Sequence, residues 1–241
     1  MTTIFWTGDS TVKHNSIATY PQTGIAQGFD RFIKRQQVQI ANFAENGCST
    51  KRFIDEGRLA PIYDLMQARD FLFIQFGHND EKASDPARYA EPSHAFGDNL
   101  ERFVNAARNK GGYPVLITPV TRRLFRDPHA AYRHDDWAEA MRQTAARLDV
   151  PVVDLTRRSE ELVDSLTETE SRQLYMNFPA GIYPQYPEGR EDNTHLRPAG
   201  ALTFAGLIAR ELYTLGGVYA DLLCDGFDQW AAKKQMNRFM A

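Results

Sequence analysis

The sequence lacks the features that mark several classes of protein. Only two cysteines occur in 241 residues, Cys48 and Cys224, so the composition suits a reducing compartment rather than a disulfide framework. We expect both to be buried as small apolar residues, not to serve as a catalytic thiol or a bridge. No apolar stretch is long enough to span a bilayer. Lys and Arg (28) nearly balance Asp and Glu (31), so charge gives no basis for binding nucleic acid or an anionic membrane.

Targeting and cofactor motifs are also missing. No basic segment with an apolar signal region precedes the first expected strand, so we expect a cytoplasmic protein unless an export signal was removed. There is no His-Glu-x-x-His motif and no cysteine pair at metal-ligand spacing, so the sequence predicts neither a metal nor another cofactor. We find no internal repeat, linker or low-complexity tract, and no indication of the oligomeric state.

What the sequence does contain is a regular alternation of short apolar runs and helical patterns. The expected strands are Ile4–Thr7, Val38–Phe43, Phe71–Phe76, Tyr113–Thr118 and Val152–Val153. Apolar residues spaced for one helix face lie between them, and a last long helix should follow Pro198. Continuous apolar strands that alternate with helices are typical of a parallel sheet covered on both faces. We therefore predict an α/β protein, a three-layer α/β/α sandwich with a mostly parallel sheet of about five strands.

We expect one domain over residues 1–241, because this length is sufficient for one substantial core. Leu174–Asp192 is rich in Pro, Gly and Tyr and is interpreted as a long surface loop. Residues 216–241 are interpreted as an extension packed on the domain. The apolar residues expected to hold this extension are Tyr219, Leu222, Phe227, Trp230 and Met236.

Small and polar residues follow four of the expected strands. In parallel sheets the ligand crevice lies beyond the carboxyl ends of the strands, where Ser10, Gly47, residues 77–80 and residues 118–119 would emerge. Their convergence on one edge predicts a shared site.

Ser10, Asp192 and His195 are the candidate catalytic residues. A serine hydroxyl is a poor nucleophile until an adjacent base removes its proton, and that base needs a third group to orient it. Asp192 and His195 are three residues apart, which we interpret as one side of a helical turn. The alternatives are that Ser10 caps a helix after the first strand, and that residues 192–194 cap the final helix.

Five short blocks carry a resemblance to a known family. They are Gly8-Asp9-Ser10-Thr11, Glu45-Asn46-Gly47-Cys48-Ser49-Thr50, Phe76-Gly77-His78-Asn79-Asp80, Thr118-Pro119-Val120-Thr121-Arg122-Arg123 and Asp192-Asn193-Thr194-His195. With these blocks the chain resembles the SGNH (GDSL-like) hydrolases, which have a flavodoxin-like fold. Within that superfamily it is most similar to the rhamnogalacturonan acetylesterases. The resemblance covers residues 4 to about 200.

The resemblance implies an oxyanion hole made by the backbone N–H groups of Ser10 and Gly47 and the side-chain amide of Asn79. A glycine permits close backbone approach, and an asparagine amide offers two uncharged donors. Taken singly, Gly47 is better explained as a turn glycine and Asn79 as a helix cap. Asp9 and Asp80 are expected to be structural, each bonding nearby backbone N–H groups.

Substrate contacts are assigned to His78, Arg122 and Tyr183. Arg122 or Arg123 could pair with a uronic acid carboxylate, and a surface charge role is an equal alternative. His78 is also expected to shape the Asn79 loop. Aromatic side chains near residue 180 are expected either to face sugar rings or to hold their loop in place. They are Tyr175, Phe178, Tyr183 and Tyr186.

Together, these expectations predict a serine esterase that removes O-acetyl groups from an acetylated saccharide. The resemblance implies rhamnogalacturonan or related pectic oligosaccharides as the substrate. A lipase, thioesterase or general arylesterase on the same scaffold is the alternative within enzymes. A catalytically silent carbohydrate-binding protein is the alternative outside them.

Overall fold

A five-stranded parallel sheet forms the centre of the molecule. The computed structural model describes residues 1–126, 129–130 and 135–229. The strands of this sheet are β1 (Thr2–Gly8), β2 (Val38–Asn42), β3 (Phe71–Gln75), β4 (Tyr113–Ile117) and β7 (Val152–Val153). Their spatial order is β2-β1-β3-β4-β7, and every neighbouring pair is parallel. All five strands were predicted from the apolar runs.

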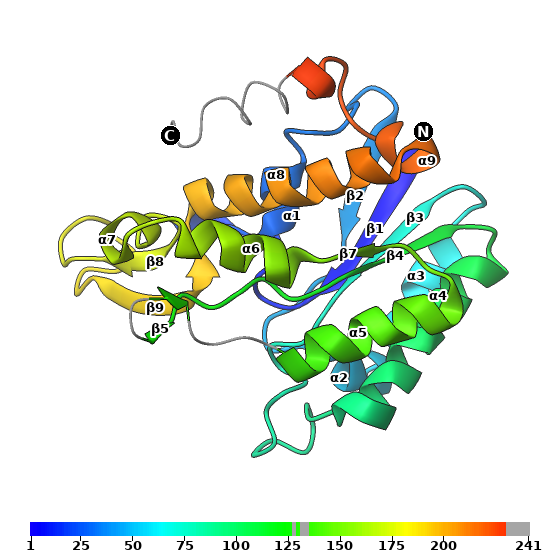
Figure 1. The fold of residues 1–241 in the computed structure, drawn as a ribbon, viewed down its shortest axis with the longest axis horizontal. Coiled ribbons are helices and arrows are strands. Elements are labelled where there is room, and N and C mark those ends of the chain that lie inside the picture. The colour runs from blue at the N-terminus through cyan, green and yellow to red at the C-terminus, as the bar shows by residue number, and fades with distance from the viewer. Residues whose placement is uncertain (127–128, 131–134, 230–241) are drawn as a thin grey trace.

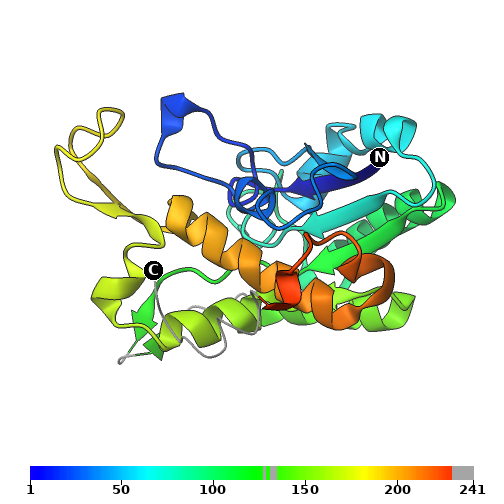
Figure 2. The ribbon, with the colours of Figure 1, turned by 90° about the horizontal axis from the view of Figure 1, so that it is seen from above.

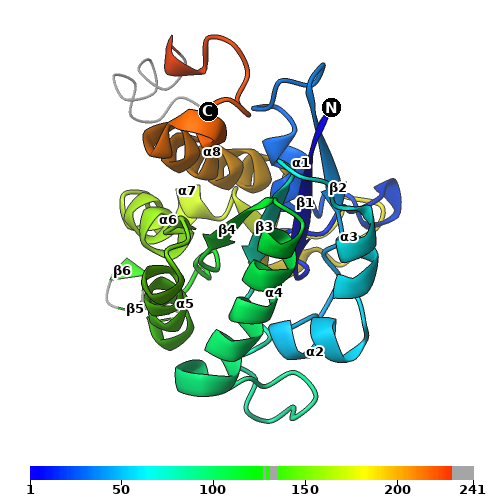
Figure 3. The same ribbon diagram turned by 90° about the vertical axis from the view of Figure 1, so that its right-hand side faces the viewer.

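Helices cover both faces of this sheet, because successive strand residues point to opposite sides. In β3, Phe71 and Phe73 belong to one buried cluster, whereas Leu72 and Ile74 belong to the other. The first cluster is completed by α1 (Ile25–Phe29), α6 (Leu155–Asp164) and α8 (Pro198–Leu215). The second is completed by α2 (Thr50–Asp55), α3 (Leu59–Leu65), α4 (Gly97–Asn109) and α5 (Asp135–Leu148). Figures 1 and 3 show α6 beside α8 and α4 beside α5. The predicted three-layer sandwich is confirmed.

The helices follow the expected patterns with some changes in length. Their bounds are α1 (Ile25–Phe29), α2 (Thr50–Asp55), α3 (Leu59–Leu65), α4 (Gly97–Asn109), α5 (Asp135–Leu148), α6 (Leu155–Asp164), α7 (Glu168–Ser171), α8 (Pro198–Leu215) and α9 (Gly217–Ala220), with short turns η1 (Ile17–Thr19) and η2 (Pro92–Phe96). Helix α8 begins at Pro198, as predicted, since the first helical turn tolerates a missing N–H. Helix α1 is shorter than the apolar spacing suggests, although Phe32 and Ile33 beyond it are still buried.

The interpretation of Leu174–Asp192 as one long loop is wrong. Strands β8 (Tyr175–Phe178) and β9 (Arg190–Leu196) form an antiparallel hairpin there. The connection between them extends away from the sheet beside η1 (Figure 2). Two hydrogen bonds join these segments, from Gln185 Nε2 to the Ile17 carbonyl (3.2 Å) and from Tyr186 Oη to the Thr19 carbonyl (3.2 Å). A second small ribbon pairs β5 (Phe125–Arg126) with β6 (His129–Ala130).

After α8 the chain returns to the core. Leu222, Leu223 and Phe227 are buried in the cluster that α1 and α8 share. Trp230 and Met236, which were expected to help hold this extension, lie outside the described residues. Among residues 1–126, 129–130 and 135–229, no helix combines the length and hydropathy that crossing a bilayer would require.

Candidate active site

Three polar side chains from the two ends of the chain form a continuous hydrogen-bonded series. Ser10 follows β1, and its Oγ lies 2.9 Å from Nε2 of His195 on β9. The other ring nitrogen of His195, Nδ1, lies 2.7 Å from Oδ2 of Asp192. The sequence positions are 185 residues apart, and the fold brings them within bonding distance. Ser10 bonds the imidazole and does not cap a helix.

Asp192 and His195 do not lie on a helical turn, so that interpretation was wrong. Both belong to β9, where the pairing with β8 shifts: Tyr175 is opposite Leu196, but Met176 is opposite Asp192. The extra residues on β9 bulge out of the hairpin. Asp192 Oδ1 closes this bulge by accepting bonds from the backbone N–H groups of Thr194 (2.9 Å) and His195 (3.0 Å). A bulge re-aims side chains within a strand, and here it turns the imidazole toward Ser10.

Residues 192–194 do not cap the final helix either. The residue that precedes α8 is Arg197, and its side chain makes no capping bond.

Asp192 is held in its ionised form. Burial favours the neutral acid, but the hydrogen bond and charge of His195, with the two backbone N–H groups, hold the pKa of Asp192 well below its ordinary value. Arg190 adds a further contact, with Nη2 2.8 Å from Asp192 Oδ2. The carboxylate is therefore charged throughout the neutral range, as a group that stabilises an imidazolium must be.

The loop after β1 is fixed by its own backbone and by Asp9. A Cβ at Gly8 would lie 2.7 Å from the Gln75 carbonyl oxygen, so only glycine allows β1 to approach β3 this closely. Asp9 Oδ1 accepts bonds from Thr11 N (2.8 Å) and Thr11 Oγ1 (2.7 Å). The turn that presents Ser10 is thus held without using the serine hydroxyl.

Gly47 and Asn79 lie on the loops that follow the strands on either side of β1. Gly47 has φ +66°, a left-handed conformation that favours glycine. Asn79 is buried and donates from Nδ2 to the Cys48 carbonyl (3.1 Å), which joins the two loops. The Gly47 loop also meets the Ser10 loop, since Glu45 N donates to the Gly8 carbonyl (3.1 Å) and Glu45 pairs with Lys13.

A buried polar layer lies directly behind these loops. Asp80 Oδ1 accepts a bond from Thr50 N (2.9 Å), so Asp9 and Asp80 both bond backbone N–H groups, as expected. His78 Nδ1 lies 3.3 Å from Asp9 Oδ2. Burial favours the neutral acid of Asp9, but the charge and hydrogen bonding of His78 lower the pKa of Asp9 to about 2. Burial, together with the Asp9 charge, raises the pKa of Asp80 to about 7.

His78 belongs to this buried layer, being only 4% exposed and in contact with Asp9. Its position directly before Asn79 agrees with the expectation that His78 shapes the Asn79 loop. Its assignment as a substrate contact stays a prediction.

Arg122 and Arg123 anchor the bulge that carries the candidate base. Arg122 bonds Thr194 Oγ1 and pairs with Glu81 (2.8 Å), and it lies 3.5 Å from the His78 carbonyl. Arg123 donates from its backbone N to the Asn193 carbonyl (2.8 Å) and from Nη1 to Asn193 Oδ1 (3.0 Å). Both guanidinium groups therefore have protein partners, which favours a structural role over a uronate contact.

The aromatic side chains of the hairpin differ in exposure. Tyr175 is fully buried and donates to the Thr121 carbonyl (2.8 Å), so the idea that it faces a sugar ring is wrong. Tyr183 packs edge-on against Phe178 (4.7 Å between centroids) and Tyr20 (5.6 Å). Its hydroxyl accepts a bond from Arg197 (3.0 Å). These contacts hold the hairpin against the segment around η1.

The thiol of Cys48 is not a competing nucleophile. The side chain is 1% exposed, and burial raises the pKa of Cys48 to about 12, so no thiolate forms near neutral pH. In the part of the chain that the structure describes, no group of three His, Cys, Asp or Glu side chains is arranged to hold a metal ion.

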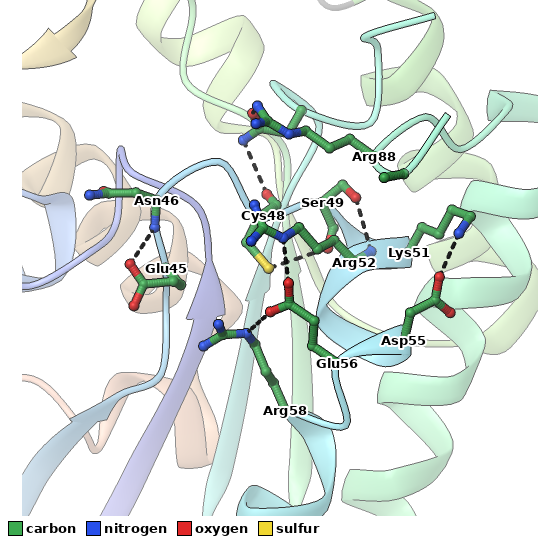
Figure 4. A network of polar contacts seen from close by, with 12 residues as sticks. Glu45, Asn46, Cys48, Ser49, Lys51, Arg52, Asp55, Glu56, Arg58 and Arg88 are labelled. Atoms are coloured by element: carbon green, nitrogen blue, oxygen red, sulfur yellow. Dashed lines mark hydrogen bonds and ion pairs between the residues drawn. The ribbon is translucent and has the colours of Figure 1, made fainter. Parts of the chain in front are cut away.

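Several residues at this edge of the sheet were not expected from the sequence. Arg190 binds Asp192, Lys13 pairs with Glu45, and Arg88 reaches Asn79 (3.5 Å from Nη1 to Oδ1). Figure 4 shows Arg88 extending from its own loop toward the turn of Asn46 and Cys48. None of the five motif blocks includes Arg190, Lys13 or Arg88, and the role of each follows only from its contacts in the folded protein.

An α/β/α sandwich with a serine, histidine and aspartate at the carboxyl edge of its sheet is an architecture of ester hydrolases. The sequence model of the GDSL-like Lipase/Acylhydrolase family matches residues 7–201. The chain belongs to this family, and the resemblance noted from its motifs is confirmed.

Two relatives align with most of this chain and with most of their own length. Rhamnogalacturonan acetylesterase RhgT of Bacillus subtilis (strain 168) is 38% identical over 88% of this chain and 90% of its own length. The probable rhamnogalacturonan acetylesterase YesY of the same strain is 35% identical over 88% of this chain and 93% of its own. The crystal structure of YxiM from Bacillus subtilis aligns with a TM-score of 0.76 at 24% identity, over 89% of this chain and 57% of that one. This last likeness concerns the fold alone.

Proposed function

We propose that the protein is a serine carbohydrate esterase that removes O-acetyl groups from acetylated saccharides, with rhamnogalacturonan or related pectic oligosaccharides as substrates. The observation that carries the proposal is the series Ser10 Oγ, His195, Asp192, with separations of 2.9 and 2.7 Å. The two relatives named as rhamnogalacturonan acetylesterases support the substrate class.

In the proposed reaction, Ser10 Oγ attacks the acetyl carbonyl carbon while His195 Nε2 accepts the hydroxyl proton. The tetrahedral oxygen then takes hydrogen bonds from the backbone N–H groups of Ser10 and Gly47 and from Asn79 Nδ2. The carbon–oxygen bond to the sugar breaks, and the sugar hydroxyl leaves with the proton from His195. Water repeats the sequence on the acetyl-enzyme and releases acetate.

The alternative of a lipase or thioesterase requires an apolar channel for a long acyl chain. The segments that flank the series are instead polar and charged, with Arg190, Arg122 and the hairpin tyrosines among them. Tyr183 and Tyr186, both partly exposed, remain the proposed faces for sugar rings.

Acyl-chain preference separates these activities. We expect the protein to hydrolyse p-nitrophenyl acetate faster than p-nitrophenyl octanoate, because the segments that flank Ser10 and His195 are polar and charged. The measurement is kcat/KM for each ester, followed by acetate release from a panel of acetylated glycans. Faster octanoate turnover would reject the acetylesterase assignment. Glycan binding with no ester turnover would instead favour a silent binding protein.

A further inference from the structure

Arg88 lies over the proposed oxyanion hole although it belongs to none of the motif blocks. It sits in the segment between β3 and η2, and its side chain is 28% exposed. Asp85 fixes both the backbone and the guanidinium of Arg88. The backbone N of Arg88 donates to the Asp85 carbonyl (3.0 Å), and Arg88 Nε pairs with Asp85 Oδ2 (2.9 Å). The guanidinium is therefore held in one place, and it points toward the Asn46–Cys48 turn (Figure 4).

The guanidinium lies flat against Gly47. A Cβ built at Gly47 would be 3.3 Å from Arg88 Cζ, 3.3 Å from Nη1 and 3.4 Å from Nη2. Three nearly equal distances mean that the face of the planar group, not its edge, covers this residue. The glycine thus has two reasons to be there, its positive φ and the space that the Arg88 face occupies.

The same guanidinium determines how the Asn79 amide is oriented. Arg88 Nη1 lies 3.5 Å from Asn79 Oδ1, while Asn79 Nδ2 donates to the Cys48 carbonyl (3.1 Å). At 3.5 Å the first contact acts mainly through charge. A flipped amide would place its NH2 group against the cation and its oxygen against the Cys48 carbonyl, so both neighbours oppose the flip. One Nδ2–H bonds Cys48, and the other is available for an incoming oxygen.

We propose that Arg88 is a positioning residue for the oxyanion hole, which orients the Asn79 amide and covers the Gly47 turn. The inference rests on the proposed esterase function. Arg88 acts through Asn79, so its loss should lower kcat for any acetyl ester, including one with no charged group. An arginine that recognised a substrate carboxylate would instead change KM, and only for acidic sugars.

The test is a double-mutant cycle on p-nitrophenyl acetate, which carries no carboxylate. We expect Arg88→Ala to lower kcat on the order of tenfold with little change in KM. In the Asn79→Ala background the same substitution should have a clearly smaller effect, because the amide that Arg88 orients is gone and only its cover of the Gly47 turn is lost. Arg88→Lys should recover part of the loss, since it returns the charge without the planar face.

The matched control is Arg147→Ala, which removes an exposed arginine of α5 that pairs with Glu101 of α4 and should leave kcat unchanged. Thermal unfolding of each variant identifies any loss of fold. Equal effects of Arg88→Ala in both backgrounds, or an unchanged kcat, would overturn the inference while the esterase function stands. A wild-type protein that hydrolyses no acetyl ester would overturn the function itself, and the inference with it.

Discussion

Asp192→Asn is expected to lower kcat by about 10⁴-fold while the fold is retained. Asp192 Oδ2 accepts the Nδ1–H of His195 at 2.7 Å, which leaves Nε2 free to accept the Ser10 proton. An asparagine in this place can present its NH2 group to Nδ1 and so favour the wrong tautomer. It also removes the charge that stabilises the imidazolium in the transition state. The measurement is kcat on p-nitrophenyl acetate, with thermal unfolding as a check of the fold.

Asp64→Asn provides the control for this substitution. Asp64 is exposed on α3, away from the hairpin, so the same chemical change there should leave kcat unaffected. If Asp192→Asn retained more than about a tenth of the wild-type kcat, Asp192 would not be the group that orients the base.

Asn79→Ala is expected to lower kcat by roughly a hundredfold or more, since the loss of one oxyanion donor typically costs about 2.7–4 kcal/mol of transition-state stabilisation. Asn79 is buried and fixed by Cys48 and Arg88, so its amide is preorganised. KM should change little, because the donor acts on charge that develops only in the transition state.

Asn79→Asp sharpens this test because it keeps the size of the side chain and replaces the donor by an acceptor. Its kcat should fall at least as far as that of Asn79→Ala. Asn105→Ala, on the exposed face of α4, is the control and should behave as the wild type. A near-unchanged kcat in Asn79→Ala would remove Asn79 from the oxyanion hole.

The sheet could be predicted because its strands are buried on both faces. Phe71 to Gln75 is an unbroken buried run, and such runs stand out in a sequence without any knowledge of partners. The meeting of Ser10, Gly47 and Asn79 at one edge also followed from the sheet, since parallel strands end on the same side. Both predictions need only the local pattern of apolar residues and the direction in which the parallel strands run.

The hairpin could not be predicted in the same way. Strand β9 is Arg-Glu-Asp-Asn-Thr-His-Leu, a partly exposed polar strand with no alternation of apolar residues. Its conformation depends on long-range bonds, such as those from Arg123 to Asn193 and from Asn177 Nδ2 to the Asp192 carbonyl (3.0 Å). A spacing of three residues fits a helical turn and a closed bulge equally well, and only these tertiary contacts select the bulge.

For Arg122 and Arg88, too, the sequence alone does not predict which groups the side chain contacts. Arg122 follows a strand at the expected edge, which suggested a substrate contact, but Glu81 and Thr194 come from elsewhere to engage it. Arg88 lies in a segment without any chemical motif, yet its guanidinium covers Gly47. Sequence pattern indicates which loops meet, whereas the pairing of long side chains within them is decided by packing.

The most direct test of the account is covalent labelling of the proposed nucleophile. The protein is treated with diethyl p-nitrophenyl phosphate, and the modified peptide is identified by mass spectrometry while esterase activity is followed. We expect one diethylphosphoryl group per chain on Ser10, loss of activity in proportion to labelling, and neither label nor turnover in Ser10→Ala. A label on another residue, or full activity in Ser10→Ala, would contradict the assignment of Ser10 as the nucleophile.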